Sequence, residues 1–135
     1  MIYNNVLDAV GNTPVVRLNR MVDEDSAQIL VKIEGLNMGG SIKTRTAFNM
    51  ITDAENRGLI NKDTIIVEPT SGNQGIGLAL VGAVKGYKTV IIMPDSVSEE
   101  RRKLVRHYGA EVIVVHAAGN IGDAIEECTQ IAMKM

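Results

Sequence analysis

A chain of 135 residues, with 45% hydrophobic and 22% charged residues, has the size of one globular domain and can bury a core without metals or disulfides. The formal net charge of -2 argues against a nucleic-acid or membrane-surface partner, and the apolar runs are far shorter than the ~20 residues of a membrane-spanning helix. The single cysteine, Cys128, permits no internal disulfide and fits a reducing, cytoplasmic compartment.

The N-terminal part of the chain predicts two short strands and one helix. A turn of Gly11-Asn12-Thr13-Pro14 precedes the first strand, and a loop with two glycines, residues 37–41, follows the second. Apolar residues recur at helical spacing from residue 42 to residue 57, and Gly58 is typical of a helix end. The two predicted strands are residues 15–18 and 29–33.

The rest of the chain alternates strands and helices. The predicted strands are residues 64–67, 88–93 and 111–115, and the predicted helices are residues 74–85, 98–108 and 121–133. This order predicts an α/β fold in which a parallel sheet is covered by helices on both faces. Ligands of such folds bind at the carboxyl ends of the strands, so the loops after Val67 and Met93 are the first places to expect a site.

Lys43 is the first candidate for chemistry. The preceding Met38-Gly39-Gly40-Ser41-Ile42 predicts a tight turn into a helix, with free backbone amides at its start. The positive end of the helix dipole disfavours the charged form of a lysine in the first turn, and an uncharged lysine is the nucleophile that forms Schiff bases. The alternative is an exposed lysine at an ordinary helix start, and the local sequence alone favours it.

The second candidate is a polar loop that follows a predicted buried strand and opens a helix. Its glycines allow a ligand to approach the backbone amides, and the polar side chains around them can donate hydrogen bonds to a carboxylate or phosphate. The glycine spacing differs from that of a dinucleotide-binding turn, and the Gly-Lys-Ser/Thr ending of a P-loop is missing. A purely structural turn is the alternative, but four polar donors favour binding: Thr70, Ser71, Asn73 and Gln74.

The remaining candidates are weaker. His107 is expected on a solvated basic helix face, and His116 ends a strand without an evident partner. Cys128 lies in the last predicted helix, where packing is its expected role. No spacing of His, Cys, Asp and Glu suggests a metal site.

Together with their flanking strings, the two candidate sites resemble one enzyme family. The strings are Gly11-Asn12-Thr13-Pro14-Val15-Val16-Arg17-Leu18, Lys32-Ile33-Glu34, Asn37-Met38-Gly39-Gly40-Ser41-Ile42-Lys43, Glu68-Pro69-Thr70-Ser71-Gly72-Asn73 and Tyr108-Gly109-Ala110-Glu111-Val112. They are similar, in order and spacing, to the cysteine synthase (O-acetylserine sulfhydrylase) family of fold-type-II pyridoxal-phosphate enzymes. The resemblance covers nearly all of the chain.

The resemblance implies a tryptophan synthase beta-like fold, pyridoxal 5'-phosphate as cofactor, and a role for each candidate residue. Lys43 would carry the cofactor as a Schiff base and then act as the base at the α-carbon, and Asn73 would hydrogen-bond the cofactor's 3'-oxygen. The implied reaction is β-replacement on a β-substituted L-amino acid, forming L-cysteine from O-acetyl-L-serine and sulfide through an aminoacrylate. The residues implied to hold the substrate's α-carboxylate are Thr70, Ser71, Gly72, Asn73 and Gln74.

Three positions depart from the family's pattern. Met38 replaces a proline, Thr44 replaces the aspartate after the lysine, and Gln74 replaces a threonine. Gln74 carries a longer amide side chain, so it changes what touches the carboxylate or the β-substituent. The resemblance therefore leaves open an L-cysteine lyase or desulfhydrase that releases hydrogen sulfide.

The family's chains are longer, and their Gly-Thr-Gly-Gly-Thr loop for the cofactor phosphate has no counterpart here. We expect residues 1–135 to be the N-terminal portion of such an enzyme, with a small mobile carboxylate-binding domain at about residues 45–135. Alone, this portion is expected to be inactive, and a non-catalytic amino-acid-binding fragment is the alternative. The resemblance also implies a homodimer and a possible serine acetyltransferase partner.

Overall fold

A computed structural model describes residues 2–116 and 121–134 and contains every strand and helix that the sequence predicts. Their ends differ from the predicted ends by at most two residues, and two 3-10 helices are additional. In chain order the elements are η1 (Val6–Ala9), β1 (Val15–Arg17), β2 (Leu30–Lys32), η2 (Glu34–Leu36), α1 (Lys43–Asn56), β3 (Ile65–Pro69), α2 (Asn73–Lys85), β4 (Lys88–Pro94), α3 (Glu99–His107), β5 (Glu111–Val115) and α4 (Ile121–Ala132).

The three strands of the second half form the predicted parallel sheet, in the order β3-β4-β5. Val67 pairs with Val90, which in turn pairs with Glu111, so β4 is the central strand. Because the strands are parallel, the loops that follow them meet at one edge of the sheet. The loop between β3 and α2 therefore lies at that edge.

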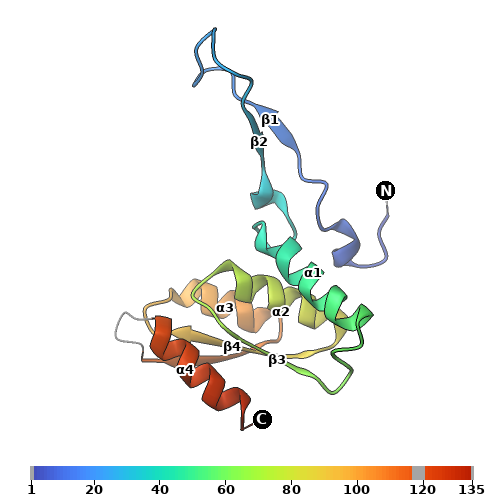
Figure 1. The fold of residues 1–135 in the computed structure, drawn as a ribbon, viewed down its shortest axis with the longest axis vertical. Coiled ribbons are helices and arrows are strands. Elements are labelled where there is room, and N and C mark those ends of the chain that lie inside the picture. Colours follow the sequence, from blue (N-terminus) through green and yellow to red (C-terminus); the bar gives the residue numbers. More distant parts are fainter. Residues whose placement is uncertain (1, 117–120, 135) are drawn as a thin grey trace.

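Alternate residues of β4 separate the two faces of the sheet. Ile91 and Met93 belong to a core that includes residues of α1, α2 and α3, whereas Val90 and Ile92 pack with Cys128 of α4. All four strand residues are fully buried. Figure 1 shows the same layering, with α2 and α3 on one side of the sheet and α4 on the other. The prediction that helices cover both faces is confirmed.

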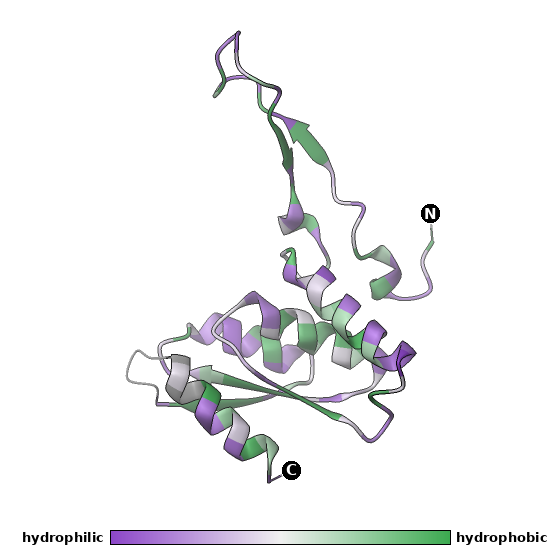
Figure 2. Cartoon of the chain, viewed as in Figure 1, coloured by the Kyte–Doolittle hydropathy of each residue, from purple (hydrophilic) through white to green (hydrophobic). Residues whose placement is uncertain are grey.

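Strands β1 and β2 form a separate antiparallel hairpin in which Val16 pairs with Val31. The hairpin projects away from the sheet and its helices (Figure 1), and its strands are predominantly apolar (Figure 2). Val15, Leu30 and their neighbours are exposed in this structure. Among residues 2–116 and 121–134, no helix is both long and apolar enough to cross a membrane.

Candidate functional site

Lys43 lies in the first turn of α1, as predicted, and is the first residue of that helix; its side chain is exposed. The Lys43 backbone N–H donates to Oγ of Ser41 at 3.2 Å. The next residue, Thr44, is fully buried, and its hydroxyl accepts a hydrogen bond from the N–H of Gly39 at 3.1 Å. A Cβ on Gly39 would lie only 2.5 Å from Oγ1 of Thr44. The loop of Gly39 and Gly40 therefore packs directly against the first turn of α1, and the Lys43 side chain remains accessible to solvent.

The polar loop after β3 begins with Thr70, which is 9% exposed. Its N–H donates to the carbonyl of Ile92 in β4 at 2.9 Å, and its hydroxyl accepts from the N–H of Gly72 at 3.2 Å. Ser71 and Asn73 are exposed, and Asn73 is the first residue of α2. The loop thus presents polar groups at a helix N-terminus, where backbone amides attract an anion.

Two glycines of α2 allow unusually close packing beneath this loop. A Cβ on Gly75 would lie 2.5 Å from Cγ2 of Thr70 and 2.9 Å from Cγ2 of Ile91. A Cβ on Gly77 would lie 2.8 Å from the carbonyl oxygen of Lys43. Since Gly77 is four residues from Asn73, it places the start of α1 beside the first turns of α2. This contact connects the two candidate motifs, which are separated by some thirty residues of sequence.

The amide of Gln74 faces α1 in this structure. Its Nε2 lies 3.6 Å from Sδ of Met50, a weak hydrogen bond to a thioether. Its Oε1 is buried, and no hydrogen-bond partner for it exists among the described residues. Met50 is seven residues after Lys43, which places both on the same side of α1. Sequence analysis did not identify Met50, because nothing in its local sequence distinguishes it from an ordinary helix residue.

A polar network, the Arg45 network, joins residues that precede the lysine loop to the first turn of α1; its members are Gly11, Thr13, Glu34, Asn37 and Arg45. Arg45 Nε donates to Oε2 of Glu34 at 2.8 Å, and its Nη2 donates to Oε1 of Glu34 at 2.9 Å and to Oγ1 of Thr13 at 3.1 Å. Thr13 also donates to Glu34 at 2.6 Å, and Asn37 Nδ2 donates to Glu34 at 2.8 Å. Asn37 Oδ1 accepts from the N–H of Gly11 at 3.0 Å.

The pair at the centre of the Arg45 network stays charged over a wide pH range. Hydrogen bonds from Arg45 and Thr13 lower the pKa of Glu34 to about 2. Both oxygens of the carboxylate are engaged by the guanidinium, the bidentate arrangement that gives arginine its directional binding. Sequence analysis quoted strings that contain Thr13 and Glu34 but assigned these residues no role, and it did not single out Arg45.

His116 differs from its prediction, because it does have a partner. Its Nδ1 lies 2.5 Å from Oδ2 of Asp95, the residue after β4, and this contact lowers the pKa of Asp95. The parallel register explains the meeting, since β4 and β5 end side by side. His107 is exposed, as expected. Cys128 is buried in the core beneath α4, and burial raises the pKa of its thiol, which confirms the packing role.

Arg101 of α3 is a further residue at the polar loop that sequence analysis did not single out. Its Nη1 donates to the carbonyl oxygen of Ser71 at 3.0 Å. The contact joins α3 to the loop and adds positive charge beside it. The periodic sequence of α3 indicates only that Arg101 lies on a polar helix face, so its partner follows from the tertiary structure.

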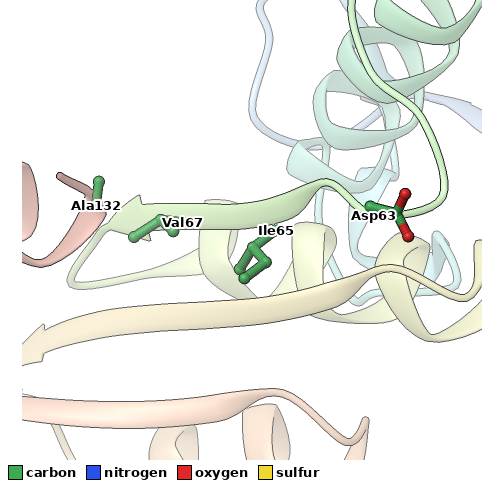
Figure 3. A pocket seen from close by; sticks show the side chains of 4 residues that line it. All are labelled: Asp63, Ile65, Val67 and Ala132. Carbon is green, nitrogen blue, oxygen red and sulfur yellow. The ribbon is translucent and has the colours of Figure 1, made fainter. Parts of the chain in front are cut away.

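A cavity elsewhere in the fold is unrelated to these groups. It has a volume of ≈ 450 Å³ and is lined by Asp63, Ile65, Val67 and Ala132 (Figure 3). Ile65 and Val67 belong to the core on the α4 face of the sheet, whereas α1 and α2 pack on the opposite face. The cavity therefore does not contribute to the site around Lys43.

The described groups fit one class of site. An accessible amine lies at the start of one helix, and a loop with several hydrogen-bond donors opens a second helix packed against it. An aldehyde cofactor can reach the amine, and a carboxylate can take the loop's donors. Amino-acid chemistry on a Schiff-base cofactor requires groups of these two kinds.

Comparison with known proteins agrees with this class. Residues 6–135 match the family described as pyridoxal-phosphate dependent enzyme, and the chain belongs to that family. A cysteine synthase of a Flavobacterium species is 52% identical over 98% of this chain and 43% of its own length. The chain thus spans less than half of that relative.

Solved structures include relatives with different chemistry. A hydrogen sulfide-producing enzyme from Fusobacterium nucleatum has a TM-score of 0.89 and 46% identity, over 99% of this chain and 44% of its own. An O-ureido-L-serine synthase has a TM-score of 0.92 and 42% identity, over 99% of this chain and 42% of its own. The predicted fold-type-II architecture is confirmed by neighbours of this kind.

Proposed function

We propose that this chain supplies the lysine and the substrate-carboxylate loop of a pyridoxal-phosphate enzyme that carries out β-replacement on a β-substituted L-amino acid. The proposed reaction forms L-cysteine from O-acetyl-L-serine and sulfide, in line with the cysteine synthase relatives. The observation that carries the proposal is the packing of the Lys43 carbonyl against Gly77, one helical turn from Asn73. That contact brings an accessible amine and an anion-binding loop to the same pair of helix starts.

Each residue has a proposed task. Lys43 binds the cofactor's aldehyde carbon and afterwards moves the proton of the substrate's α-carbon, for which its exposed position at the start of α1 is suited. Asn73 donates a hydrogen bond to the 3'-oxygen of the cofactor. When bound, pyridoxal phosphate supplies the electron sink for the α-carbon. The proposed carboxylate ligands are Thr70, Ser71, Gly72, Asn73 and Gln74.

Several properties of the whole protein are proposals of the same kind. We propose that residues from about 45 to 135 act as a small carboxylate-binding domain that moves when substrate binds. The chain spans 43% of the length of the Flavobacterium cysteine synthase, and we propose no residue of this chain as a ligand of the cofactor phosphate. A cytoplasmic homodimer, with serine acetyltransferase as a possible partner, completes the proposal.

A second function has support of its own. The Fusobacterium neighbour is a hydrogen sulfide-producing enzyme, and Gln74 of this chain turns toward α1 with an unpaired oxygen. A cysteine-consuming lyase, with water or another thiol as the incoming group, would use the same lysine and the same loop. The amide at position 74 is a plausible point at which the two activities diverge, because it borders the carboxylate loop.

The test of the site is to reduce the cofactor-loaded protein with borohydride and to map the modified peptides. Reduction fixes a Schiff base covalently, so the expected result is a cofactor adduct on Lys43. Lys62, an exposed lysine outside both motifs, is the internal control and should carry little adduct. An adduct on a lysine other than Lys43, with none on Lys43, would contradict the proposed function.

The two activities separate by product analysis. The protein is supplied with O-acetyl-L-serine plus sulfide, or with L-cysteine alone, and the amino acids and free sulfide are quantified. Cysteine formation in the first assay without sulfide release in the second identifies a synthase. Sulfide release from cysteine as the faster reaction favours the lyase instead.

A further inference from the structure

Three features of the Arg45 network bear on the lysine that it adjoins. Arg45 is two residues after Lys43, in the first turn of α1, and its guanidinium is tied to Glu34 by two parallel hydrogen bonds. Gly40, in the loop before Lys43, donates its N–H to the carbonyl of Asn37 at 2.7 Å. Asn37 is itself held by Glu34. The same carboxylate thus fixes the chain on both sides of Lys43.

Thr44, which lies between Lys43 and Arg45, restricts the glycine loop further. Thr44 is fully buried and receives the N–H of Gly39. Three contacts restrict the movement of the loop relative to the helix start. They are the hydrogen bond from Gly39 to Thr44, the hydrogen bond from Gly40 to the Asn37 carbonyl, and the bidentate ion pair of Arg45 with Glu34. Lys43 itself is exposed and forms none of these bonds through its side chain. The direction in which that side chain leaves the helix therefore depends on how the surrounding backbone is held.

The chemistry of the pair suits such a positioning task. Side chains of Arg45 and Glu34 are 36% and 16% exposed, so water screens the pair only in part. A planar guanidinium that binds both carboxylate oxygens fixes an orientation as well as a distance, whereas a lysine ammonium would fix only a distance. Glu34 begins η2, shortly after β2 of the hairpin, whereas Arg45 lies in the first turn of α1, so the pair joins the hairpin to the helix start.

We propose that Glu34 and Arg45 are positioning residues for Lys43: their bidentate ion pair holds the glycine loop and the first turn of α1 so that the Lys43 amine is aimed at the carbonyl of its cofactor. This inference rests on the proposed function, in which Lys43 forms the Schiff base. It adds that the reactivity of Lys43 is set by residues that touch neither cofactor nor substrate.

The test compares the site selectivity of Schiff-base formation among variants of the cofactor-loaded protein. Pyridoxal phosphate is supplied at a limiting amount, borohydride is added after a short interval, and peptide mapping gives the share of adduct on Lys43 relative to exposed Lys62 and Lys103. The variants are Arg45→Lys, Glu34→Gln and the exchanged pair Glu34→Arg with Arg45→Glu. Asp53→Asn is the matched control, because it breaks an exposed ion pair on the same helix.

The expected result is a fall of about fivefold in the Lys43 share for Arg45→Lys and for Glu34→Gln, the scale of the net contribution of one ordinary hydrogen bond. The exchanged pair should recover part of the share, and Asp53→Asn should leave it unchanged. Amide hydrogen exchange in β4, recorded on the same samples, should stay at the level of the original protein. If β4 keeps its protection from exchange, a fall in the Lys43 share reflects a changed orientation of the lysine and not unfolding of the protein.

Two outcomes would overturn the inference. An unchanged Lys43 share in both single variants would mean that the ion pair does not aim the lysine, while the proposed function would survive. Loss of β4 protection in every variant that loses selectivity would mean that the network holds the fold and nothing more. By contrast, absence of any adduct on Lys43 in the original protein would refute the proposed function itself, so the two failures are distinguishable.

Discussion

At the scale of single residues, the packing of the candidate site depends on two glycines of α2, which have no side chain. Gly75 and Gly77 let Thr70 and the backbone of Lys43 approach α2 more closely than any Cβ would permit. These glycines lie in the first two turns of α2, and a glycine inside a helix lowers its stability by roughly 1 kcal/mol relative to alanine. Close approach of the two motifs offsets that cost. Gly75 thus allows Thr70 and Ile91 to pack closely against α2, and Gly77 allows the Lys43 carbonyl to do so.

Substitution at Gly75 tests this interpretation. Gly75→Ala should lower the free energy of unfolding by about 1–3 kcal/mol, because its Cβ would overlap Thr70 and Ile91 in a packed region. Denaturant unfolding followed by circular dichroism measures the effect. Gly35→Ala is the matched control, since a Cβ there meets nothing within 4 Å and its backbone φ is not in the left-handed region. Equal stability of the two variants would show that the close packing around Gly75 can relax.

At the scale of elements, β4 is the strand on which both layers depend. Its residues alternate between the α1–α3 core and the α4 core, and they are fully buried on either face. The adjacent strands are less buried: Val114 of β5 is 41% exposed. Since the loop that carries Thr70 is bonded to Ile92, β4 also fixes one end of the candidate site.

Valine substitutions within the sheet should separate central from peripheral positions. Val90→Ala should reduce the free energy of unfolding by about 2 kcal/mol, from two lost methyl groups and the space they leave. Val114→Ala, the same change on the exposed side of β5, should alter it by less than about 0.5 kcal/mol. Thermal or denaturant unfolding of both variants provides the comparison. Equal losses would contradict the central role of β4.

At the scale of the whole molecule, three carboxylates join parts that are distant in sequence. Glu34 binds Arg45 across the hairpin base, Glu55 of α1 binds Lys85 of α2, and Asp95 contacts His116. The pKa of each carboxylate is lowered by its partner. Glu68 on β3 is the opposite case, because burial raises its pKa. The tertiary contacts thus have a direct consequence for stability against acid.

Stability should fall as pH falls, because lowered carboxylate pKa values favour the folded state only while the groups are ionised. For Glu34 the contribution is fully present above the unfolded-state value of 4.5 and is lost as pH falls toward about 2. Glu34→Gln should flatten the decline of the unfolding free energy over that interval. Denaturant unfolding at a series of pH values measures it. A variant with the same pH dependence as the original protein would show that Glu34 is not ion-paired in solution.

Much of this fold is determined locally by the sequence. Every strand and α-helix within residues 2–116 and 121–134 was predicted within two residues, because buried strands are continuously apolar and amphipathic helices repeat every 3.6 residues. Parallel pairing followed from the alternation of these elements. The family resemblance rests on short strings around Lys43 and Thr70, whose order and spacing are properties of the sequence alone.

Only the tertiary structure determined which side chains meet. Arg45 and Glu34, Gln74 and Met50, Arg101 and Ser71, and Asp95 and His116 come from different elements, and no periodicity in the sequence encodes these pairs. The expectation that His116 lacks a partner was wrong for this reason, since parallel register brings together residues twenty-one positions apart. Sequence determined the elements and their chemistry, because those depend on neighbours along the chain. Packing between elements decided the network of Glu34 and Arg45 next to Lys43, because hydrogen bonds depend on neighbours in space.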